Sequence, residues 1–349
     1  MNEHSQLPLS QLTTLRLGGP ARRVVEAVSE EEIVETARAA DERGEPLLVM
    51  GAGSNLVVAD EGFDGTVLRV ASRGAATLGG ALVVAAGEPW DAVVALAVAQ
   101  GGSGIECLSG IPGLAGATPI QNVGAYGQEV AQTIVFVRAF DRQAGAACQL
   151  APEECGFGYR TSAFRHSDRY VVLAVGFALE RSPESRPITY PELARRLGIE
   201  VGDCAPLAAV REAVIELRRG KGMVLDQDDP DSVSAGSFFL NPVLSAEDFA
   251  AFRGRVHDRL GEDVQPPAWP QDGEGVKVSA AWLIERAGFR RGHGSGRAGI
   301  SSKHTLAVVN RGGASAAEVI ALARELRDGV RETFGVVLTP EPTLVGMTL

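Results

Sequence analysis

The N-terminal part of the chain alternates apolar runs with polar breaks, a pattern that predicts strands and one helix. Apolar residues over 23–28 are typical of a strand, and a second apolar run lies at 47–50. Between the two runs, Ser29 is followed three positions later by Glu32, which is the pattern of a helix capping box. The sequence therefore predicts a helix over 33–43.

The turn after the second run does not fit a Rossmann dinucleotide-binding motif. Residues 51–55 read Gly-Ala-Gly-Ser-Asn, and the apolar segments at 56–58 and 66–70 that follow are typical of strands. A Rossmann motif needs a helix directly after the glycines, because the helix N-terminus receives the pyrophosphate. A strand–turn–strand arrangement can still bind phosphates through backbone N–H groups.

Strands and helices also alternate through the rest of the chain, which favours a mixed α and β fold. The patterns predict strands over 82–86, 134–140, 170–179, 305–309 and 336–338, and helices over 90–100, 207–219 and 279–287. Two further helices are indicated by the pairs Ser245 with Asp248 and Ser315 with Glu318. An Asp-rich loop over 220–230 precedes the last region.

Length and composition narrow the class of protein. A chain of 349 residues is too long for one ordinary core, so we expect two or three domains. The hydrophobic share of 45% is ample for globular packing. No charged patch followed by an apolar run opens the chain, and the apolar stretch at 92–99 is far short of a bilayer span. We therefore expect a cytoplasmic protein without membrane insertion.

Charge and cysteine usage limit the partners. A net charge of −11 disfavours nucleic acid, which needs a basic surface, although a few local Arg and Lys residues suffice for a small anion. The four cysteines form no CxxC pair and the five histidines are scattered. We therefore expect reduced thiols and no metal site.

Two clusters of glycines are candidates for ligand binding. Glycine permits positive φ and a close approach of the backbone to a ligand. Either cluster alone is more simply interpreted as a pair of turns. Together, with polar neighbours, they suit a long dinucleotide that lies across both. The two clusters comprise Gly51 and Gly53, with Ser54 and Asn55 beside them, and Gly110, Gly113, Gly116, Gly124 and Gly127, with Thr118 and Asn122 among them.

Three shorter motifs carry reactive side chains, and each has an ordinary alternative. Arg160 lies between a Tyr and a Thr and could be a surface residue. Ser237 lies between a Gly and two Phe residues and could belong to a turn packed by aromatics. Glu341 lies between two prolines, and residues alone favour an exposed loop tip over a held catalytic group.

These motifs, taken in order, resemble the UDP-N-acetylenolpyruvoylglucosamine reductase family. The resemblance is collinear, covers nearly all of the chain and rests on several separate motifs in register. They are Thr-Leu-Arg-Leu-Gly-Gly at 14–19, Gly-Ala-Gly-Ser-Asn at 51–55, Ser-Gly-Ile-Pro-Gly at 109–113, Pro-Ile-Gln-Asn-Val-Gly-Ala-Tyr-Gly at 119–127, Gly-Tyr-Arg at 158–160, Gly-Ser-Phe-Phe at 236–239, Asn-Pro at 241–242 and Pro-Glu at 340–341.

The resemblance implies a fold and a reaction. It implies a two-subdomain FAD-binding domain of the vanillyl-alcohol-oxidase (PCMH) type and a C-terminal α/β substrate-binding domain. We place the three parts at 1–72, 73–215 and 216–349. The implied reaction is reduction of UDP-N-acetylglucosamine enolpyruvate with non-covalent FAD and with NADPH as co-substrate, in peptidoglycan precursor synthesis. We further expect a monomer.

The resemblance also assigns residues by position. Catalytic roles fall on Arg160, Ser237 and Glu341. The FAD contacts are expected from Gly51, Ala52, Gly53, Ser54, Asn55, Pro112, Gly113, Thr118, Pro119, Asn122, Gly124, Ala125 and Tyr126. Substrate contacts are expected from Tyr126, Arg160, Tyr190, Lys221, Asn241 and Lys277, with Tyr190 in a loop that closes over substrate in one branch of the family. Leu240 is a departure, since some members have lysine there.

Two other functions remain to be separated from this one. A different FAD enzyme of the same fold, such as an alcohol oxidase, often attaches flavin through a His near the first glycine cluster. No His lies between His4 and His166 here, which disfavours such an attachment. A non-catalytic nucleotide-binding protein is the second alternative, and the presence of Arg160 and Glu341 disfavours it.

Overall fold

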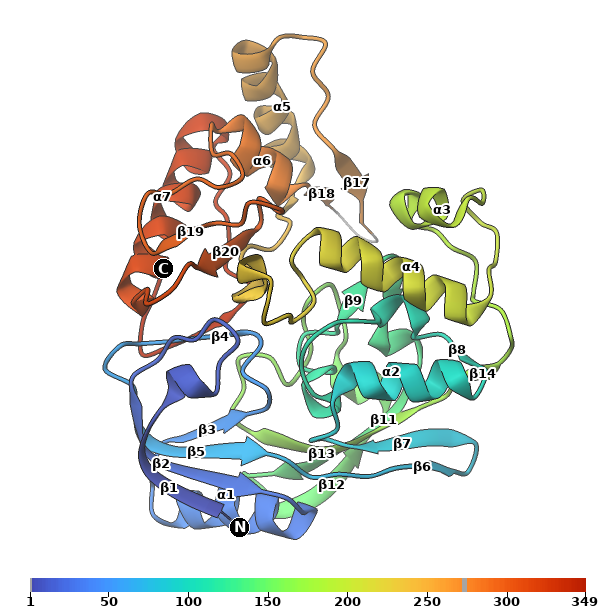
Figure 1. The fold of residues 1–349 in the computed structure, drawn as a ribbon, viewed down its shortest axis with the longest axis vertical. Coiled ribbons are helices and arrows are strands. Elements are labelled where there is room, and N and C mark those ends of the chain that lie inside the picture. Colours follow the sequence, from blue (N-terminus) through green and yellow to red (C-terminus); the bar gives the residue numbers. More distant parts are fainter. Residues whose placement is uncertain (1, 272–274) are drawn as a thin grey trace. The chain divides into compact units, whose positions relative to one another are not determined.

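The computed structural model describes residues 2–271 and 275–349, and the chain divides into two compact units (Figure 1). Unit 1 comprises Met1–Leu7, Ala21–Gly53 and Phe63–Gly220, and unit 2 comprises Pro8–Pro20, Ser54–Gly62 and Lys221–Leu349. The chain thus enters unit 2 three times. The three-part division at 1–72, 73–215 and 216–349 stays a prediction.

The first sheet of unit 1 has the strand order β1-β2-β5-β3 and is parallel where β5 meets β2 and β3. Its strands are β1 (Asn2–Pro8), β2 (Pro20–Ala27), β5 (Phe63–Val70) and β3 (Leu47–Met50), and helix α1 (Glu30–Glu42) lies between β2 and β3 in sequence. Ser29 accepts the N–H of Glu32 and so caps α1 as predicted. The helix packs on the sheet because Ile33 and Ala37 share one core with Leu68.

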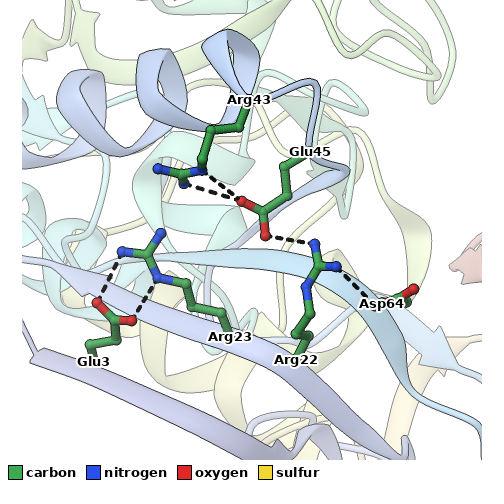
Figure 2. A network of polar contacts seen from close by, with 6 residues as sticks. All are labelled: Glu3, Arg22, Arg23, Arg43, Glu45 and Asp64. Carbon is green, nitrogen blue, oxygen red and sulfur yellow. Dashed lines mark hydrogen bonds and ion pairs between the residues drawn. The ribbon is translucent and has the colours of Figure 1, made fainter.

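Ion pairs link the strands of this sheet at the surface (Figure 2). Arg22 and Arg23 are neighbours on β2, and successive side chains of a strand point to opposite faces. Arg23 binds both carboxylate oxygens of Glu3 on β1, at 2.7 and 2.9 Å. Arg22 contacts Glu45 at 2.8 Å and Asp64 at 3.2 Å. The polar strand β1 is therefore fastened to its neighbour by charged side chains, although exposed pairs of this kind contribute little individually.

The second sheet of unit 1 is antiparallel, with the order β12-β11-β13-β7-β6. Helix α2 covers it, since Val93 and Val94 of α2 belong to the same buried cluster as the sheet residues, and the rings of Trp90 and Phe177 lie 5.6 Å apart. The remaining elements of unit 1 are β12 (Ala146–Leu150), β11 (Ile134–Asp141), β13 (Tyr170–Phe177), β7 (Ala81–Ala85), β6 (Ala75–Leu78), β8 (Gly102–Ser103), β9 (Gly124–Ala125), β10 (Gln128–Glu129), β14 (Glu180–Arg181), α2 (Trp90–Ala99), α3 (Pro191–Leu197) and α4 (Leu207–Gly220).

In its described residues, unit 2 packs helices α5, α6 and α7 against short strands around a core of its own. The rings of Trp282 and Phe334 lie 5.6 Å apart, and Phe252 packs against both. Ser315 and Glu318 form the predicted capping box of α7. The elements are β4 (Leu56–Val58), β15 (Ser234–Ser237), β16 (Val243–Leu244), β17 (Ala268–Pro270), β18 (Val276–Val278), β19 (Ala298–Ile300), β20 (Ala307–Asn310), β21 (Thr343–Val345), α5 (Ala246–Leu260), α6 (Ala280–Arg286) and α7 (Ala316–Phe334).

Single turns of 3₁₀ helix complete the description. They are Leu9–Gln11, Glu106–Leu108, Ala115–Ala117, Val130–Gln132, Pro152–Cys155 and Pro230–Ser232. Within residues 2–271 and 275–349, no helix combines the length and the apolar character that a bilayer crossing requires.

One predicted strand is wrong. The apolar run at 336–338 suggested a strand, but these residues pair with no other strand among the described residues. Val336 and Leu338 pack into the core of unit 2, whereas Val337 is exposed. The last strand is instead β21, which pairs in parallel with β4.

Candidate active site

The two glycine clusters lie next to each other within unit 1. The first cluster follows β3, and Gly53 has φ of +63°. A Cβ atom added at Gly51 would lie 3.1 Å from Cδ1 of Leu114, which belongs to the second cluster. Gly110 and Gly113, with φ of +69° and +133°, adopt conformations that favour glycine. The two turns are therefore adjacent in space, with Leu114 packed against Gly51. The predicted stretch 51–55 leaves unit 1 after Gly53.

Not every glycine of the second cluster has the same role. A Cβ atom at Gly116 would lie 2.4 Å from Cβ of Ala86, so Gly116 permits close packing against the neighbouring strand. A Cβ atom at Gly124 would lie 2.9 Å from Nη1 of Arg160. Gly116 is thus needed for close packing in the core, whereas Gly124 leaves space for the side chain of Arg160, a candidate catalytic residue.

The segment between these glycines is shaped by its own polar side chains. Thr118 is buried and donates its hydroxyl to the carbonyl of Ala115 at 2.7 Å. Asn122 is also buried and has φ of +43°, which is uncommon for a residue with a side chain. Its amide donates to Oε2 of Glu129 at 2.8 Å and to the carbonyl of Gly158 at 3.1 Å. Contacts of these two side chains with FAD stay a prediction.

Other predicted FAD residues differ in exposure. Gly53 and Pro119 are buried, whereas Gly51, Ala52, Pro112, Gly113, Gly124, Ala125 and Tyr126 are half-buried in unit 1, and Ser54 and Asn55 are half-buried in unit 2.

Arg160 is held against this segment and is not an ordinary surface residue. Its Nη2 donates to the carbonyl of Gly124 at 2.5 Å, and its Nη1 donates to that of Asn122 at 3.4 Å. The guanidinium lies 5.5 Å from the ring centre of Tyr159 and 3.8 Å from Oε1 of Glu129. With φ of +51°, its backbone is also in the left-handed region. The guanidinium is thus oriented by several partners from one unit.

Tyr126 and Tyr190 form the second group of candidates in unit 1. Their rings lie 5.3 Å apart in an edge-to-face arrangement. Burial raises the pKa of Tyr126 to about 12, so its hydroxyl stays protonated and can donate. Tyr190 is 40% exposed and directly precedes α3. The predicted substrate-closing tyrosine therefore stands at a helix start, beside another candidate substrate residue.

In unit 2, backbone pairing brings Ser237 and Glu341 onto neighbouring segments. Ser237 ends β15, and the next residue, Phe238, accepts the N–H of Glu341 at 2.9 Å. Phe238 and Phe239 are almost fully buried, so they anchor this segment to the core of unit 2. Asn55 donates to the carbonyl of Glu341 at 3.4 Å. Glu341 is half-buried, so the exposed loop tip favoured by the residues alone is wrong.

The other substrate candidates of unit 2 lie on different elements. Lys221 is half-buried and directly follows α4. The side chain of Asn241 accepts the N–H of Ala280 at 2.9 Å and so supports the start of α6. Lys277 lies on β18, in register with Val243 on one side and Trp269 on the other. Trp269 is 47% exposed beside this lysine and was not recognised from the sequence.

Glu129 is a further site residue that the motifs did not single out. Its position next to Arg160 depends on how 119–132 folds back on 158–160, which no local pattern records. Among the described residues no group of three or more His, Cys, Asp and Glu side chains could hold a metal ion.

The paired glycine turns belong to a flavoprotein. A family model described as an FAD binding domain matches residues 21–149, which include both turns. A second model, the C-terminal domain of UDP-N-acetylenolpyruvoylglucosamine reductase, matches residues 228–345, which include Ser237 and Glu341. The fold is thus the expected α+β combination of a PCMH-type FAD domain with a C-terminal domain.

Similarity over the whole chain places it in a particular family. It is 58% identical to the UDP-N-acetylenolpyruvoylglucosamine reductase of Thermobifida fusca, over 98% of both chains, and 55% identical to that of Streptomyces coelicolor, over 100% of this chain and 92% of the relative. The crystal structure of the Thermus caldophilus reductase superposes with a TM-score of 0.68 at 28% identity and covers 99% of both chains. The chain belongs to the UDP-N-acetylenolpyruvoylglucosamine reductase family.

Proposed function

We propose that this chain reduces the enolpyruvyl ether of UDP-N-acetylglucosamine to UDP-N-acetylmuramate, with FAD as cofactor and NADPH as reductant, in peptidoglycan precursor synthesis. The observation that carries the proposal is the 58% identity to a reductase of this name over 98% of both chains. The motif residues Arg160, Ser237 and Glu341 are all present.

The residues around the glycine turns fit a non-covalent flavin dinucleotide. The turns that contain Gly51 and Gly113 are adjacent through Leu114, and positive φ at Gly53 and Gly113 is the kind of backbone that can present N–H groups to a phosphate. We assign cofactor contacts to this backbone, with Tyr126 at the end of the second stretch. When bound, the flavin supplies hydride transfer from NADPH to the substrate.

Arg160 has the task of stabilising charge. Hydride addition to the terminal carbon of the enol ether leaves negative charge on the α-carbon, which delocalises into the neighbouring carboxylate. A guanidinium is always charged and presents a rigid fork of donors. Because carbonyls of Gly124 and Asn122 already orient that fork, little reorganisation is required when charge develops. Glu341 is the further catalytic residue that the family resemblance implies.

Ser237 is the proposed proton donor to the α-carbon. A serine hydroxyl is a weak acid, so it donates only to a strongly basic centre and only from a fixed position. The burial of Phe238 and Phe239 and the bond from Glu341 N–H to Phe238 supply that fixed position. General acid catalysis of this kind is worth about 100- to 10,000-fold.

Substrate binding involves a further set of side chains. We assign contacts with the UDP-sugar to Tyr126, Tyr190, Lys221, Asn241 and Lys277. The two tyrosines offer hydroxyl donors, and the lysines offer positive charge to an anionic diphosphate on a protein whose net charge is −11. We further infer a cytoplasmic enzyme, since its nucleotide substrates are intracellular metabolites. We also infer that it is a monomer.

Anaerobic absorbance spectroscopy tests the proposed function. The purified protein is expected to be yellow, and heat should release free FAD. NADPH should bleach the flavin, and UDP-N-acetylglucosamine enolpyruvate should restore the colour without oxygen. A protein that NADPH bleaches but that this UDP-sugar fails to reoxidise would be a different flavoenzyme, and a protein that binds no flavin would refute the proposal.

A further inference from the structure

The first turn of α2 is bonded directly to the second glycine cluster. Trp90 is buried, and its backbone N–H donates to the carbonyl of Gly113 at 3.0 Å. Its indole N–H donates to the carbonyl of Leu108 at 3.1 Å. The backbone N–H of Gly116 donates to the carbonyl of Ala86 at 2.9 Å. Residues 108–116 are therefore tied at both ends to the strand and helix beside them.

Asp91 adds the charged contact of this arrangement. Its Oδ1 accepts the N–H of Gly110 at 2.6 Å. The same carboxylate accepts hydrogen bonds from both terminal nitrogens of Arg211, at 2.6 and 2.8 Å. Arg211 lies on α4, more than a hundred residues along the chain, and its side chain is only 19% exposed. Asp91 thus joins the glycine segment to two helices at once.

The chemistry of the carboxylate agrees with this geometry. Burial tends to raise the pKa of Asp91, but the hydrogen bonds from Arg211 and Gly110 outweigh it and hold the pKa below its ordinary value. The group is therefore ionised throughout the neutral range. A bidentate guanidinium–carboxylate pair also fixes direction as well as distance.

We propose that Asp91 and Arg211 are positioning residues that set the affinity for FAD, by holding Gly110 and its neighbours in the binding conformation before the flavin arrives. The proposal rests on the assignment of FAD to the glycine turns. A binding segment that is already ordered loses less conformational entropy on association, so its ligand binds more tightly. Loss of the pair should leave the fold intact and allow residues 108–116 to fluctuate.

Unit 1 contains a matched control for this pair. The carboxylate of Asp141 likewise accepts hydrogen bonds from two nitrogens of Arg169, Nε at 3.0 Å and Nη2 at 2.6 Å. It also accepts the backbone N–H of Gln143 at 3.0 Å. It lies on β11 and contacts neither glycine cluster in any of these bonds. The same substitution at Asp91 and Asp141 therefore removes a similar ion pair with and without the flavin segment.

The experiment compares FAD affinity of the full-length apoproteins. FAD is removed from wild type, Asp91→Ala, Arg211→Met and Asp141→Ala, and its dissociation constant is measured by quenching of flavin fluorescence. Asp91→Ala removes the acceptor of the Gly110 N–H together with the ion pair, and we expect it to raise the dissociation constant about 10- to 100-fold, by analogy with the loss of contacts that orient metal ligands. Arg211→Met keeps the bond from Gly110 and should raise the constant less. Asp141→Ala should leave the constant within about twofold of wild type, because Asp141 bonds to neither glycine cluster.

The possible outcomes distinguish a failure of the Asp91–Arg211 proposal from a failure of the reductase assignment. Thermal unfolding of each apoprotein shows which variants are folded. Arg211→Lys keeps the positive charge but loses the two-nitrogen contact, and it is measured in place of any variant that does not fold. Equal FAD dissociation constants for Asp91→Ala, the folded Arg211 variant and wild type would overturn the positioning role while leaving the reductase assignment untouched. Failure of the wild-type apoprotein to bind FAD would refute the assignment itself.

Discussion

At the scale of single residues, the orientation of Arg160 depends on a chain of contacts that begins at Glu129. The carboxylate of Glu129 accepts from Asn122, and the backbone of Asn122 accepts from Arg160 in turn. The same carboxylate lies 3.8 Å from the guanidinium. Glu129 therefore acts on the candidate catalytic arginine both through hydrogen bonding and through charge.

We predict that Glu129→Ala lowers kcat by about 10- to 100-fold while the flavin stays bound, because Asn122 loses a partner and Arg160 loses its support. Glu129→Gln keeps an acceptor for Asn122 and should recover most of that loss. Steady-state kinetics with the UDP-sugar measures both, with the exposed Glu180→Ala on β14 as control. Equal activity of the Ala variant and wild type would remove Glu129 from the site.

The sequence predicted the candidate residues of this site better than their environment. Arg160, Ser237 and Glu341 were assigned through the family resemblance, because each residue taken alone has an ordinary alternative such as a surface position or a loop tip. Glu129 and Asp91 were not assigned, since their partners lie elsewhere in the chain and only tertiary folding brings them close. The left-handed backbone at Asn122 and Arg160 was also not predicted, because local preference would place glycine there.

At the scale of elements, the first glycine turn has a left-handed backbone that favours glycine. Gly53 has φ of +63°, and Gly44, at the end of α1, has φ of +61° with open space around it. The two glycines thus have a similar left-handed backbone conformation. Only Gly53 lies in a predicted FAD-binding turn.

We predict that Gly53→Val folds but purifies without yellow colour, because a branched side chain blocks the approach of the phosphate. Gly44→Val is the matched control. The left-handed backbone should cost both variants a similar amount of stability, of the order of 1–3 kcal/mol, and thermal unfolding shows that each is folded. Flavin content per protein, read from absorbance, distinguishes them. Full occupancy in Gly53→Val would place the cofactor elsewhere.

Elements with a strong local signal were predicted well, and those that depend on pairing were not. β3 and β4 have the expected bounds of 47–50 and 56–58. The capping residues Ser245 and Ser315 mark the starts of α5 and α7 as expected. Residues 336–338 instead pack on the core without a partner strand, because a short apolar run indicates burial and not hydrogen bonding.

At the scale of the whole molecule, buried and paired carboxylates make stability depend on pH. Hydrogen bonds from Arg169 hold the pKa of Asp141 below its ordinary value, and those from Ser302 do the same for Asp231 against the effect of burial. A carboxyl with a lower pKa in the folded state binds fewer protons there than in the unfolded state. Its contribution is therefore present above the unfolded pKa, of about 3.9, and is lost as pH falls through the folded pKa.

We predict that the melting temperature is nearly constant from about pH 5 to 7 and falls steeply below about pH 4. Asp141→Asn removes one of the titrating groups, so its melting temperature should be lower at pH 7 and should fall less on acidification. Thermal unfolding over this pH range measures both. An Asp141→Asn curve parallel to that of wild type below pH 4 would show that Asp141 does not contribute.

The most direct test of the whole account is anaerobic stopped-flow absorbance on Ser237→Ala. The substitution removes the proposed proton donor and little volume, so the FAD site in unit 1 is unchanged. We predict that bleaching by NADPH keeps a rate within about threefold of wild type, whereas reoxidation by the UDP-sugar falls by about three orders of magnitude. Ser237→Cys should keep more activity than Ala, because a thiol can still donate a proton. If Ser237→Ala slows both half-reactions equally, Ser237 shapes the flavin site and the proton comes from another group, with Glu341 the next candidate.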